Sequence, residues 1–203
     1  MSILIIDYGM GNLASVAHAI ERLGERVVIS GSPSDLKKCK HIILPGVGAF
    51  PDAMQALREQ GWEAELRQAV LEQKQPFLGI CLGMQLLADQ GEEHETTAGL
   101  GFISGAVKPL PANMERLPHI GWNEVHQTSS SQLFENIEPS RDFYFVHSFH
   151  FLPTNPNVIA GTTEYCGGFV SVIEHENIFA VQFHPEKSSK NGMKLLSNFI
   201  KFQ

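Results

Sequence analysis

Short apolar runs alternate with helical patterns through the first half of the chain, and this alternation most limits how the chain can fold. Residues 2–7 (SILIID) predict a strand, followed by glycines and a helical pattern over residues 12–24. The same reasoning predicts strands at 27–29, 41–44 and 77–80, and helices at 50–73, interrupted near Gly61, and at 82–90. Such alternation is typical of a parallel sheet with helices on both faces.

The second half of the chain has a different pattern. Turn residues separate strand-like segments at 105–108, 120–125, 143–147, 158–165, 169–175 and 178–183, which indicates mixed or antiparallel pairing. Residues 188–202 predict a closing amphipathic helix. The predicted fold class is therefore α/β, a doubly wound mixed, mostly parallel sheet with helices on both faces. Neither a linker nor a repeat is visible, so we expect one domain over residues 1–203.

Charge and composition exclude several classes of function. The 15 Lys+Arg are scattered among 22 Asp+Glu, and the net charge of -7 argues against a nucleic-acid ligand. The first apolar run has no basic segment before it and ends at Asp7, so we expect neither a signal peptide nor a membrane span, and a cytoplasmic location. No cluster has metal-ligand spacing, and Gly9-Met10-Gly11 lacks the third glycine of a dinucleotide fingerprint. We expect no metal and no cofactor.

Cys81 is the candidate nucleophile. It stands in Gly79-Ile80-Cys81-Leu82-Gly83, a G-x-C-x-G pattern between a predicted strand and a predicted helix, as in a nucleophile elbow. The helix dipole at that position favours the thiolate. The other two cysteines, Cys39 and Cys166, lack such a context and are interpreted as small core residues. An odd number of cysteines leaves at least one free thiol.

A thiol nucleophile needs a base, and the segment QFHPE supplies His184 and Glu186. Residues two apart in an extended segment point the same way, so Glu186 could orient the imidazole of His184 toward Cys81. The predicted catalytic triad is Cys81, His184 and Glu186. His147 and His150 are competing bases, but neither has a carboxylate two residues away.

Attack on a carboxamide develops negative charge on its oxygen, which an oxyanion hole must stabilise. The backbone N–H of Leu82 is one predicted donor. The second is expected from the loop Pro45-Gly46-Val47-Gly48, at Val47 or Gly48, because this loop follows a predicted strand and its small residues allow close approach to a ligand.

GICLGMQ around Cys81 and QFHPEKS around His184 resemble the class I, or triad, glutamine amidotransferases. Within that class, IIDYGMGN, LPGVGAF, PHIGWN, YFVHSF and HPEKS resemble the glutaminase subunits of imidazole glycerol phosphate synthases. The resemblance covers nearly the whole chain. It implies hydrolysis of L-glutamine through a glutamyl thioester and transfer of ammonia to a (β/α)8-barrel cyclase subunit in histidine biosynthesis.

The resemblance also implies roles for individual residues. It places Gly48, Gln85, His147 and Ser148 around the substrate, and Asn12, Trp122, Tyr144 and Lys187 toward the partner subunit. One position departs from the family pattern: Phe149 stands where a tyrosine is usual, so a role for that hydroxyl is lost while backbone contacts survive.

Two other readings remain open from the sequence. A cysteine peptidase on the same sheet would keep the nucleophile, and release of ammonia from glutamine without cleavage of casein would exclude it. A non-catalytic binding module would keep only the architecture. The complete set of Cys81, His184 and Glu186 argues against it, and labelling of Cys81 by an electrophilic glutamine analogue would decide.

Overall fold

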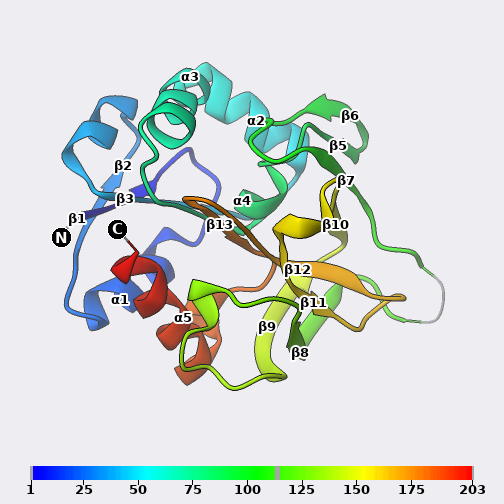
Figure 1. The fold of residues 1–203 in the computed structure, drawn as a ribbon. Helices are drawn as coiled ribbons and strands as arrows, with labels where there is room; N and C mark the ends of the chain where they lie inside the picture. Colours follow the sequence, from blue (N-terminus) through cyan, green and yellow to red (C-terminus); the bar gives the residue numbers. More distant parts are fainter. Residues whose placement is uncertain (1, 113–114, 203) are drawn as a thin grey trace.

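A nine-stranded sheet with helices on both faces forms the centre of the molecule in a computed structural model that describes residues 2–112 and 115–202 (Figure 1). Its strand order is β2-β1-β3-β4-β13-β12-β11-β8-β9. The strands from β2 to β13 pair in parallel: β1 (Ser2–Ile6), β2 (Arg26–Ser30), β3 (His41–Gly46), β4 (Phe77–Cys81) and β13 (Ile178–Val181). Antiparallel pairing continues the sheet through β12 (Phe169–His175), β11 (Ile159–Thr163), β8 (His119–Gln127) and β9 (Arg141–His147).

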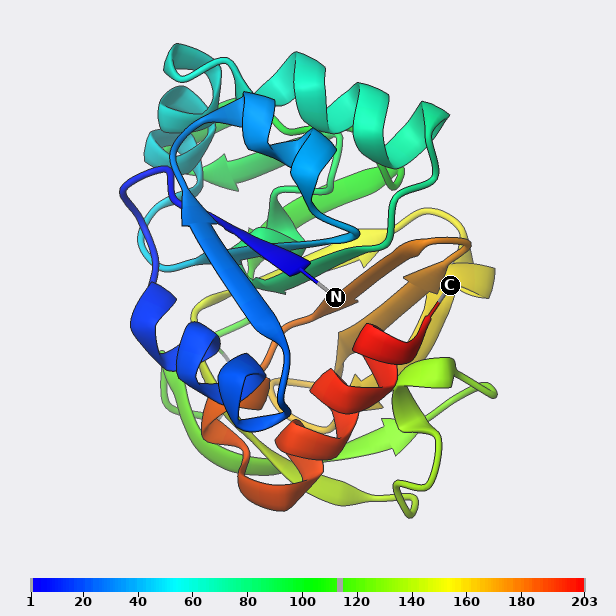
Figure 2. The same cartoon turned by 90° about the vertical axis from the view of Figure 1, so that its left-hand side faces the viewer.

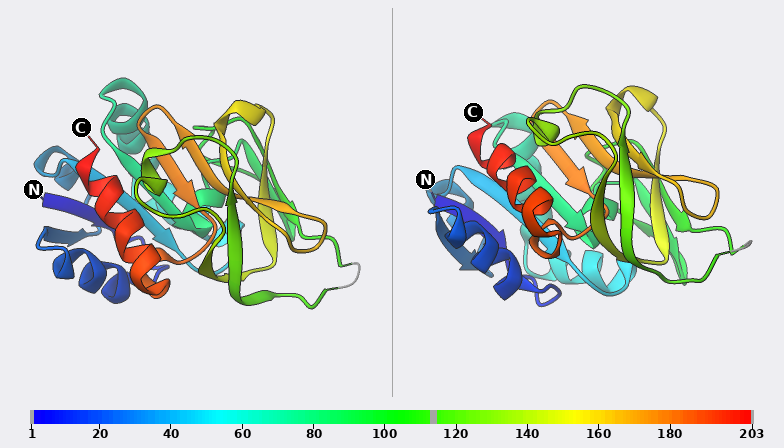
Figure 3. Two further views of the ribbon diagram at one scale, coloured as in Figure 1. Left: turned by 60° about the horizontal axis from the view of Figure 1, so that its bottom comes forward. Right: turned by 90° about the horizontal axis from the view of Figure 1, so that it is seen from below.

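Helices cover both faces of the parallel part of the sheet. α1 (Leu13–Arg22) and α5 (Ser189–Lys201) lie side by side on one face, and α2 (Phe50–Glu59) and α3 (Trp62–Arg67) lie on the other (Figures 2 and 3). A π-helical turn, η2 (Gln68–Glu72), continues α3. Neighbouring residues of β1 serve the two faces alternately: Ile3 and Ile5 pack in the core of α1 and α5, whereas Leu4 and Ile6 pack in the core of α2 and α3. The predicted fold class is confirmed.

The predicted elements of the first half are largely present. The break predicted near Gly61 separates α2 from α3, and Gly61 itself has a left-handed φ of 77°. The helix predicted at 82–90 is wrong in its length, because α4 ends at Gln85 (Leu82–Gln85). The carbonyls of Leu86 and Leu87 accept bonds from the backbone N–H groups of Leu100 and Phe102 instead of continuing a helix.

A second sheet, which the sequence did not predict as a unit, lies beside α4. It has four strands in the order β10-β7-β5-β6: β5 (Gln90–Glu93), β6 (Glu95–Ala98), β7 (Gly105–Pro109) and β10 (Phe149–Pro153). Short 3-10 turns complete the chain: η1 (Pro33–Lys38), η3 (Gln132–Phe134), η4 (Pro156–Val158) and η5 (Pro185–Lys187). Within the described ranges, no helix is long and apolar enough to cross a membrane.

Three neighbouring parallel strands bring the candidate residues to one edge of the main sheet. β3 and β13 flank β4, with Gly46 opposite Cys81 and Val181 opposite Ile80. Because the carboxyl ends of parallel strands share an edge, the loops that follow β3, β4 and β13 meet there. That edge holds the candidate active site.

Candidate active site

Cys81 occupies a strained turn between β4 and α4. Its φ of 56° and ψ of -110° lie outside the regions that L-residues favour, as in a nucleophile elbow. Glycines are required on both sides. A Cβ on Gly79 would lie 2.6 Å from the carbonyl oxygen of Gly83, and a Cβ on Gly83 would collide with the carbonyl oxygen of Leu44. The close approach of strand and helix therefore explains the G-x-C-x-G pattern.

His184 and Glu186 lie in contact after the end of β13. The Nδ1 atom of His184 is 2.9 Å from Oε1 of Glu186, and both side chains are almost fully buried. The predicted contact is present, but its geometric premise was wrong. His184 is the last residue before the η5 turn, and Glu186 lies within that turn, so a tight turn rather than an extended strand brings the two together.

The surroundings of His184 favour its protonated form. Burial acts to lower the pKa of His184, but hydrogen bonds and charge interactions with Cys81 and Glu186 outweigh it and raise the pKa to about 10. Because the Glu186 carboxylate can only accept, Nδ1 of His184 carries the proton in this contact. The second ring nitrogen is then left to exchange a proton with the Cys81 thiol.

The competing base His147 has the opposite environment. Its Nδ1 lies 2.8 Å from the carbonyl oxygen of Phe149, and its Nε2 lies 2.9 Å from Nδ1 of His119. Burial lowers the pKa of His147 to about 3, although the Phe149 carbonyl partly opposes this. An imidazole with both nitrogens engaged and so low a pKa is a poor proton acceptor. The other competitor, His150, is buried on β10 and does not line the cavity at Cys81.

Cys81 opens into a cavity of about 280 Å³ that holds most of the predicted site residues. Its lining comes from the ends of β4, β5 and β9 and from the segments that follow β3, β4, β9 and β13: Val47, Gly48, Cys81, Leu82, Gln85, Glu93, Val146, His147, Ser148, Phe149, His184 and Lys187. Gly48 has a positive φ of 109° and Val47 is 44% exposed. A Cβ on Gly46 would collide with the Tyr8 hydroxyl, so the start of this loop is tightly packed while its tip faces solvent.

Gln85 lies one helical turn beyond Cys81, and its amide is held by the protein. Its Nε2 donates to the carbonyl oxygen of Phe149 and to Oε1 of Gln182, each at 3.0 Å. The backbone of Phe149 thus makes the contacts expected to survive without a tyrosine hydroxyl. Gln182 in turn donates to Sγ of Cys81 at 3.8 Å.

Sequence reasoning missed three residues of this region. Gln182, fully buried, contacts the nucleophile, and its place two residues before His184 was the available signal. Glu93 comes from β5, a strand that was not predicted, and lines the cavity, while Oε2 of its carboxylate accepts from the N–H of Phe50 at 2.8 Å. Ser188 donates to the carbonyl oxygen of His184 at 2.6 Å and accepts from the N–H of Tyr144 at 3.0 Å, so it fixes the η5 turn against β9.

The residues predicted to face a partner lie at the start of α1, on β8 and β9, and in η5. Trp122 on β8 is 54% exposed and pairs with Tyr144 on β9, with their ring centroids 6.0 Å apart. Lys187 is exposed and also lines the cavity. Asn12 caps α1, where its side chain accepts from the N–H of Ser15, and lies beside His184 and Glu186.

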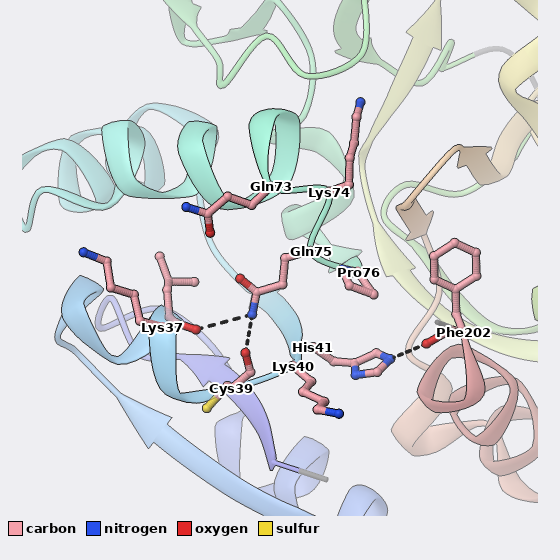
Figure 4. Close-up of a pocket in the computed structure, with 10 residues that line it drawn as sticks. Lys37, Cys39, Lys40, His41, Gln73, Lys74, Gln75, Pro76 and Phe202 are labelled. Atoms are coloured by element: carbon pink, nitrogen blue, oxygen red, sulfur yellow. Dashed lines mark hydrogen bonds between the residues drawn. The ribbon is translucent and has the colours of Figure 1, made fainter.

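A larger cavity of about 550 Å³ lies near the opposite ends of β3 and β4 (Figure 4). Two of its polar side chains bond backbone carbonyls: Gln75 donates to the carbonyl oxygens of Leu36 and Cys39, and Nε2 of His41 bonds the carbonyl oxygen of Phe202. It contains neither a strained nucleophile nor a paired base. The chemistry therefore belongs to the smaller cavity.

The three cysteines, Cys39, Cys81 and Cys166, are buried free thiols. Burial raises the pKa of Cys39 and of Cys166, which agrees with their interpretation as core residues. Among residues 2–112 and 115–202, no group of three His, Cys, Asp or Glu side chains could hold a metal ion.

Known proteins similar to this chain agree on its class. The family model "Glutamine amidotransferase class-I" matches residues 4–202. The imidazole glycerol phosphate synthase subunit HisH of Moorella thermoacetica is 49% identical over 197 residues, which cover 97% of this chain and 93% of that protein. The HisH 1 protein of Methanococcus maripaludis is 44% identical over 200 residues, with 98% of both chains covered.

Solved structures support the fold independently. PurLQS from Thermotoga maritima matches with a TM-score of 0.79 at 19% identity, over 98% of this chain and 97% of that one. A GMP synthase protein from Thermoplasma acidophilum matches with a TM-score of 0.76 at 20% identity, over 98% and 92%. Together with the full-length sequence matches, these findings show that the chain belongs to the class I glutamine amidotransferases, in the family of the HisH subunits of imidazole glycerol phosphate synthase.

Proposed function

We propose that the chain hydrolyses L-glutamine to glutamate and ammonia through a glutamyl thioester on Cys81. The observation that carries this proposal is the strained Cys81 in one cavity with His184, whose ring is held by Glu186 at 2.9 Å. Membership of the HisH family makes glutamine the substrate.

In the first half-reaction, the Cys81 thiol gives its proton to His184, and the sulfur then attacks the side-chain carbonyl carbon of glutamine to form a tetrahedral intermediate. The imidazolium then donates that proton to the departing nitrogen, the C–N bond breaks and ammonia leaves. A thioester remains on Cys81. The raised pKa of His184, about 10, favours the imidazolium that this sequence requires.

In the second half-reaction, water attacks the thioester and gives one proton to His184. Collapse of the tetrahedral intermediate breaks the C–S bond, releases glutamate and returns the proton to the sulfur. Glu186 stays ionised throughout and keeps the His184 ring in place, as the carboxylate does in other triads.

Both tetrahedral intermediates carry an oxyanion that needs N–H donors. The N–H of Leu82 has no acceptor within its own helix, because it belongs to the first turn of α4. Val47 or Gly48 supplies the second donor from across the same cavity. These assignments rest on the cavity lining and on the position of Leu82 directly after the nucleophile.

The remaining cavity residues would hold the substrate. Gly48, Gln85, His147 and Ser148 line the same space as the nucleophile. We add Glu93, because glutamine carries an α-ammonium group and Glu93 brings a carboxylate to the same cavity.

The ammonia would pass to a (β/α)8-barrel cyclase partner for imidazole glycerol phosphate formation in histidine biosynthesis. The HisH relatives are named as subunits of a synthase, which supports a heterodimer. Asn12, Trp122, Tyr144 and Lys187 would face this partner, and the exposure of Trp122 and of Ile120, at 59%, agrees with a docking face on β8. Lyase activity would belong to the complex, and a cytoplasmic location stays a prediction.

The Cys81→Ala variant tests the proposal. It should lose glutaminase activity while it still binds the cyclase partner, and the complex should still form product when ammonia is supplied. Cys166→Ala, at another buried free thiol, is the matched control and should keep glutamine-dependent activity. Full glutamine-dependent activity in Cys81→Ala would refute the assignment.

A further inference from the structure

Two buried imidazoles outside the triad form a direct contact beside the cavity. His119 on β8 and His147 on β9 are register partners, and they are only 3% and 6% exposed. Nδ1 of His119 lies 2.9 Å from Nε2 of His147. His147 lines the cavity, whereas His119 lies behind it and touches no substrate space.

At each end of the His119–His147 pair, the outer ring nitrogen meets a group that can play only one role in a hydrogen bond, either donor or acceptor. Oδ1 of Asn123 accepts the N–H of Glu124 at 2.9 Å, so the Asn123 amide nitrogen faces Nε2 of His119, at 3.3 Å, and must donate to it. At the other end, the carbonyl oxygen of Phe149 must accept from Nδ1 of His147, at 2.8 Å. Only one arrangement satisfies every contact: each ring carries its proton on Nδ1 and leaves Nε2 as an acceptor.

This arrangement requires both rings to be neutral. A second proton on either ring would point an N–H at another N–H. Burial lowers the pKa of His119 to about 4 and that of His147 to about 3, in agreement with the geometry. The charged neighbours do not reverse this: Glu115 raises the pKa of His119 only in part, and His150 and His184 lower that of His147 further.

Aromatic packing also fixes the orientation of the His119 ring. It stacks between Tyr165 and Phe145, with ring centroids 3.9 Å and 4.9 Å away, and Phe169 meets its edge at 5.7 Å. A ring with so many aromatic contacts has little freedom to turn, so its Nδ1 donor points steadily at His147.

The chain of contacts ends at the nucleophile. The Phe149 carbonyl that His147 holds is the same oxygen that accepts from Gln85 at 3.0 Å. Gln85 also bonds Gln182, which contacts Sγ of Cys81. Any displacement of the Phe149 carbonyl would therefore move the Gln85 amide in the substrate cavity.

We propose that His119 is a positioning residue for glutamine binding, acting through its Nδ1 donor on His147 and thereby on the Phe149 carbonyl and Gln85. The proposal rests on the proposed function, since it needs glutamine in this cavity. It assigns His119 no contact with the substrate and no part in proton transfer.

The test compares three variants in glutamine hydrolysis. His119→Phe keeps the stacked ring but removes the donor, and KM for glutamine should rise about tenfold, with kcat changed much less, because one buried acceptor loses its partner. His119→Asn can place an amide N–H near the Nδ1 position and should recover most of the affinity. His41→Phe is the matched control, a buried histidine near the far end of β3, and should leave KM unchanged.

15N NMR spectra of the imidazoles supply a second readout. They are recorded on the unmodified protein and so do not depend on any substitution. Both His119 and His147 should show a protonated Nδ1 and an unprotonated Nε2 from pH 8 down to pH 5.5. An unchanged KM in His119→Phe, equal losses in His119→Asn and His119→Phe, or titration of either ring above pH 6 would each overturn the proposal. Failure of the proposed function would look different, since the unmodified protein would then hydrolyse no glutamine even with the cyclase partner and its ligand present.

Discussion

Two buried histidines line one cavity and have opposite protonation preferences. His184 follows β13 and contacts the carboxylate of Glu186, and its pKa is raised to about 10 despite burial. His147 ends β9 and contacts the imidazole of His119, and its pKa is lowered to about 3. Burial is common to both, so the partner decides which ring accepts a proton. The base of a triad is therefore identified by what holds its second nitrogen, not by distance to the nucleophile alone.

Exchange of each of the two histidines for alanine should have the largest effect and should distinguish their roles most clearly. His184→Ala should lower kcat/KM for glutamine about ten-thousandfold, because base and nucleophile act as a unit. His147→Ala should act mainly on KM. Steady-state glutaminase assays on both variants measure the difference, and a larger loss of kcat in His147→Ala would mean that the wrong histidine has been assigned.

The three residues of the proposed triad are all present in the isolated chain, so a low glutaminase activity of that chain would have to arise from another part of the site. The segment Gly46-Val47-Gly48 is the place, since Gly48 has a positive φ, Val47 is 44% exposed, and rotation of one peptide unit there would remove one oxyanion donor. We expect stimulation of about a hundred- to a thousandfold when the cyclase partner is added together with its ligand. Turnover at saturating glutamine measures it. Equal rates with and without the partner would refute gating and leave the glutaminase assignment standing.

Glu186→Gln changes only the partner of His184 and therefore tests whether that partner sets the protonation of the ring. An amide cannot stabilise the imidazolium as a carboxylate does, so the pKa of His184 should fall and kcat should drop by about a hundredfold, less than in His184→Ala. Asp142→Gln, at an exposed position of β9, is a surface control expected to have no effect. A Glu186→Gln variant with normal kcat would show that the carboxylate has no orienting role.

The smallest expected effect is on the pH dependence of the free energy of unfolding. An unfolded histidine titrates near about 6.5, so the unfolded chain binds more protons than folded His119 and His147 do as the pH falls from about 7 toward 4. The free energy of unfolding therefore decreases in that range, because the folded chain keeps both rings neutral. His184 has the opposite sign: its contribution is complete below about 6.5 and is lost as the pH rises toward 10.

Thermal unfolding between pH 5 and pH 10 tests these signs. His119→Phe should reduce the loss of Tm on the acid side, and His184→Ala should reduce the loss on the alkaline side. The reverse assignment, or identical profiles in the two variants, would contradict the account of the two environments.

Local pattern predicted the parts of the site that depend on backbone geometry. G-x-C-x-G indicated the elbow because strand and helix approach too closely at Gly79 and Gly83 for any Cβ. The His184–Glu186 contact was predicted on a wrong premise, since η5 is a turn rather than a strand.

The parts of the fold and site that could not be predicted from the sequence depend on contacts between distant segments. The second sheet pairs β5 with β7 and β7 with β10, and two of its strands, β5 (QGEE) and β6 (ETTA), have no apolar alternation of their own. Glu93 reaches the cavity only through that sheet. The pairing of His119 with His147 depends on the register of β8 against β9, which no local pattern reveals.

Labelling with an electrophilic glutamine analogue tests most directly the central claim that Cys81 attacks glutamine with His184 as its base. Peptide mapping by mass spectrometry should find one label per chain, on Cys81, and the labelling rate should fall at least about a hundredfold in His184→Ala but remain close to normal in His147→Ala at saturating analogue. Label on Cys39 or Cys166, or equal rates in the two histidine variants, would contradict the claim.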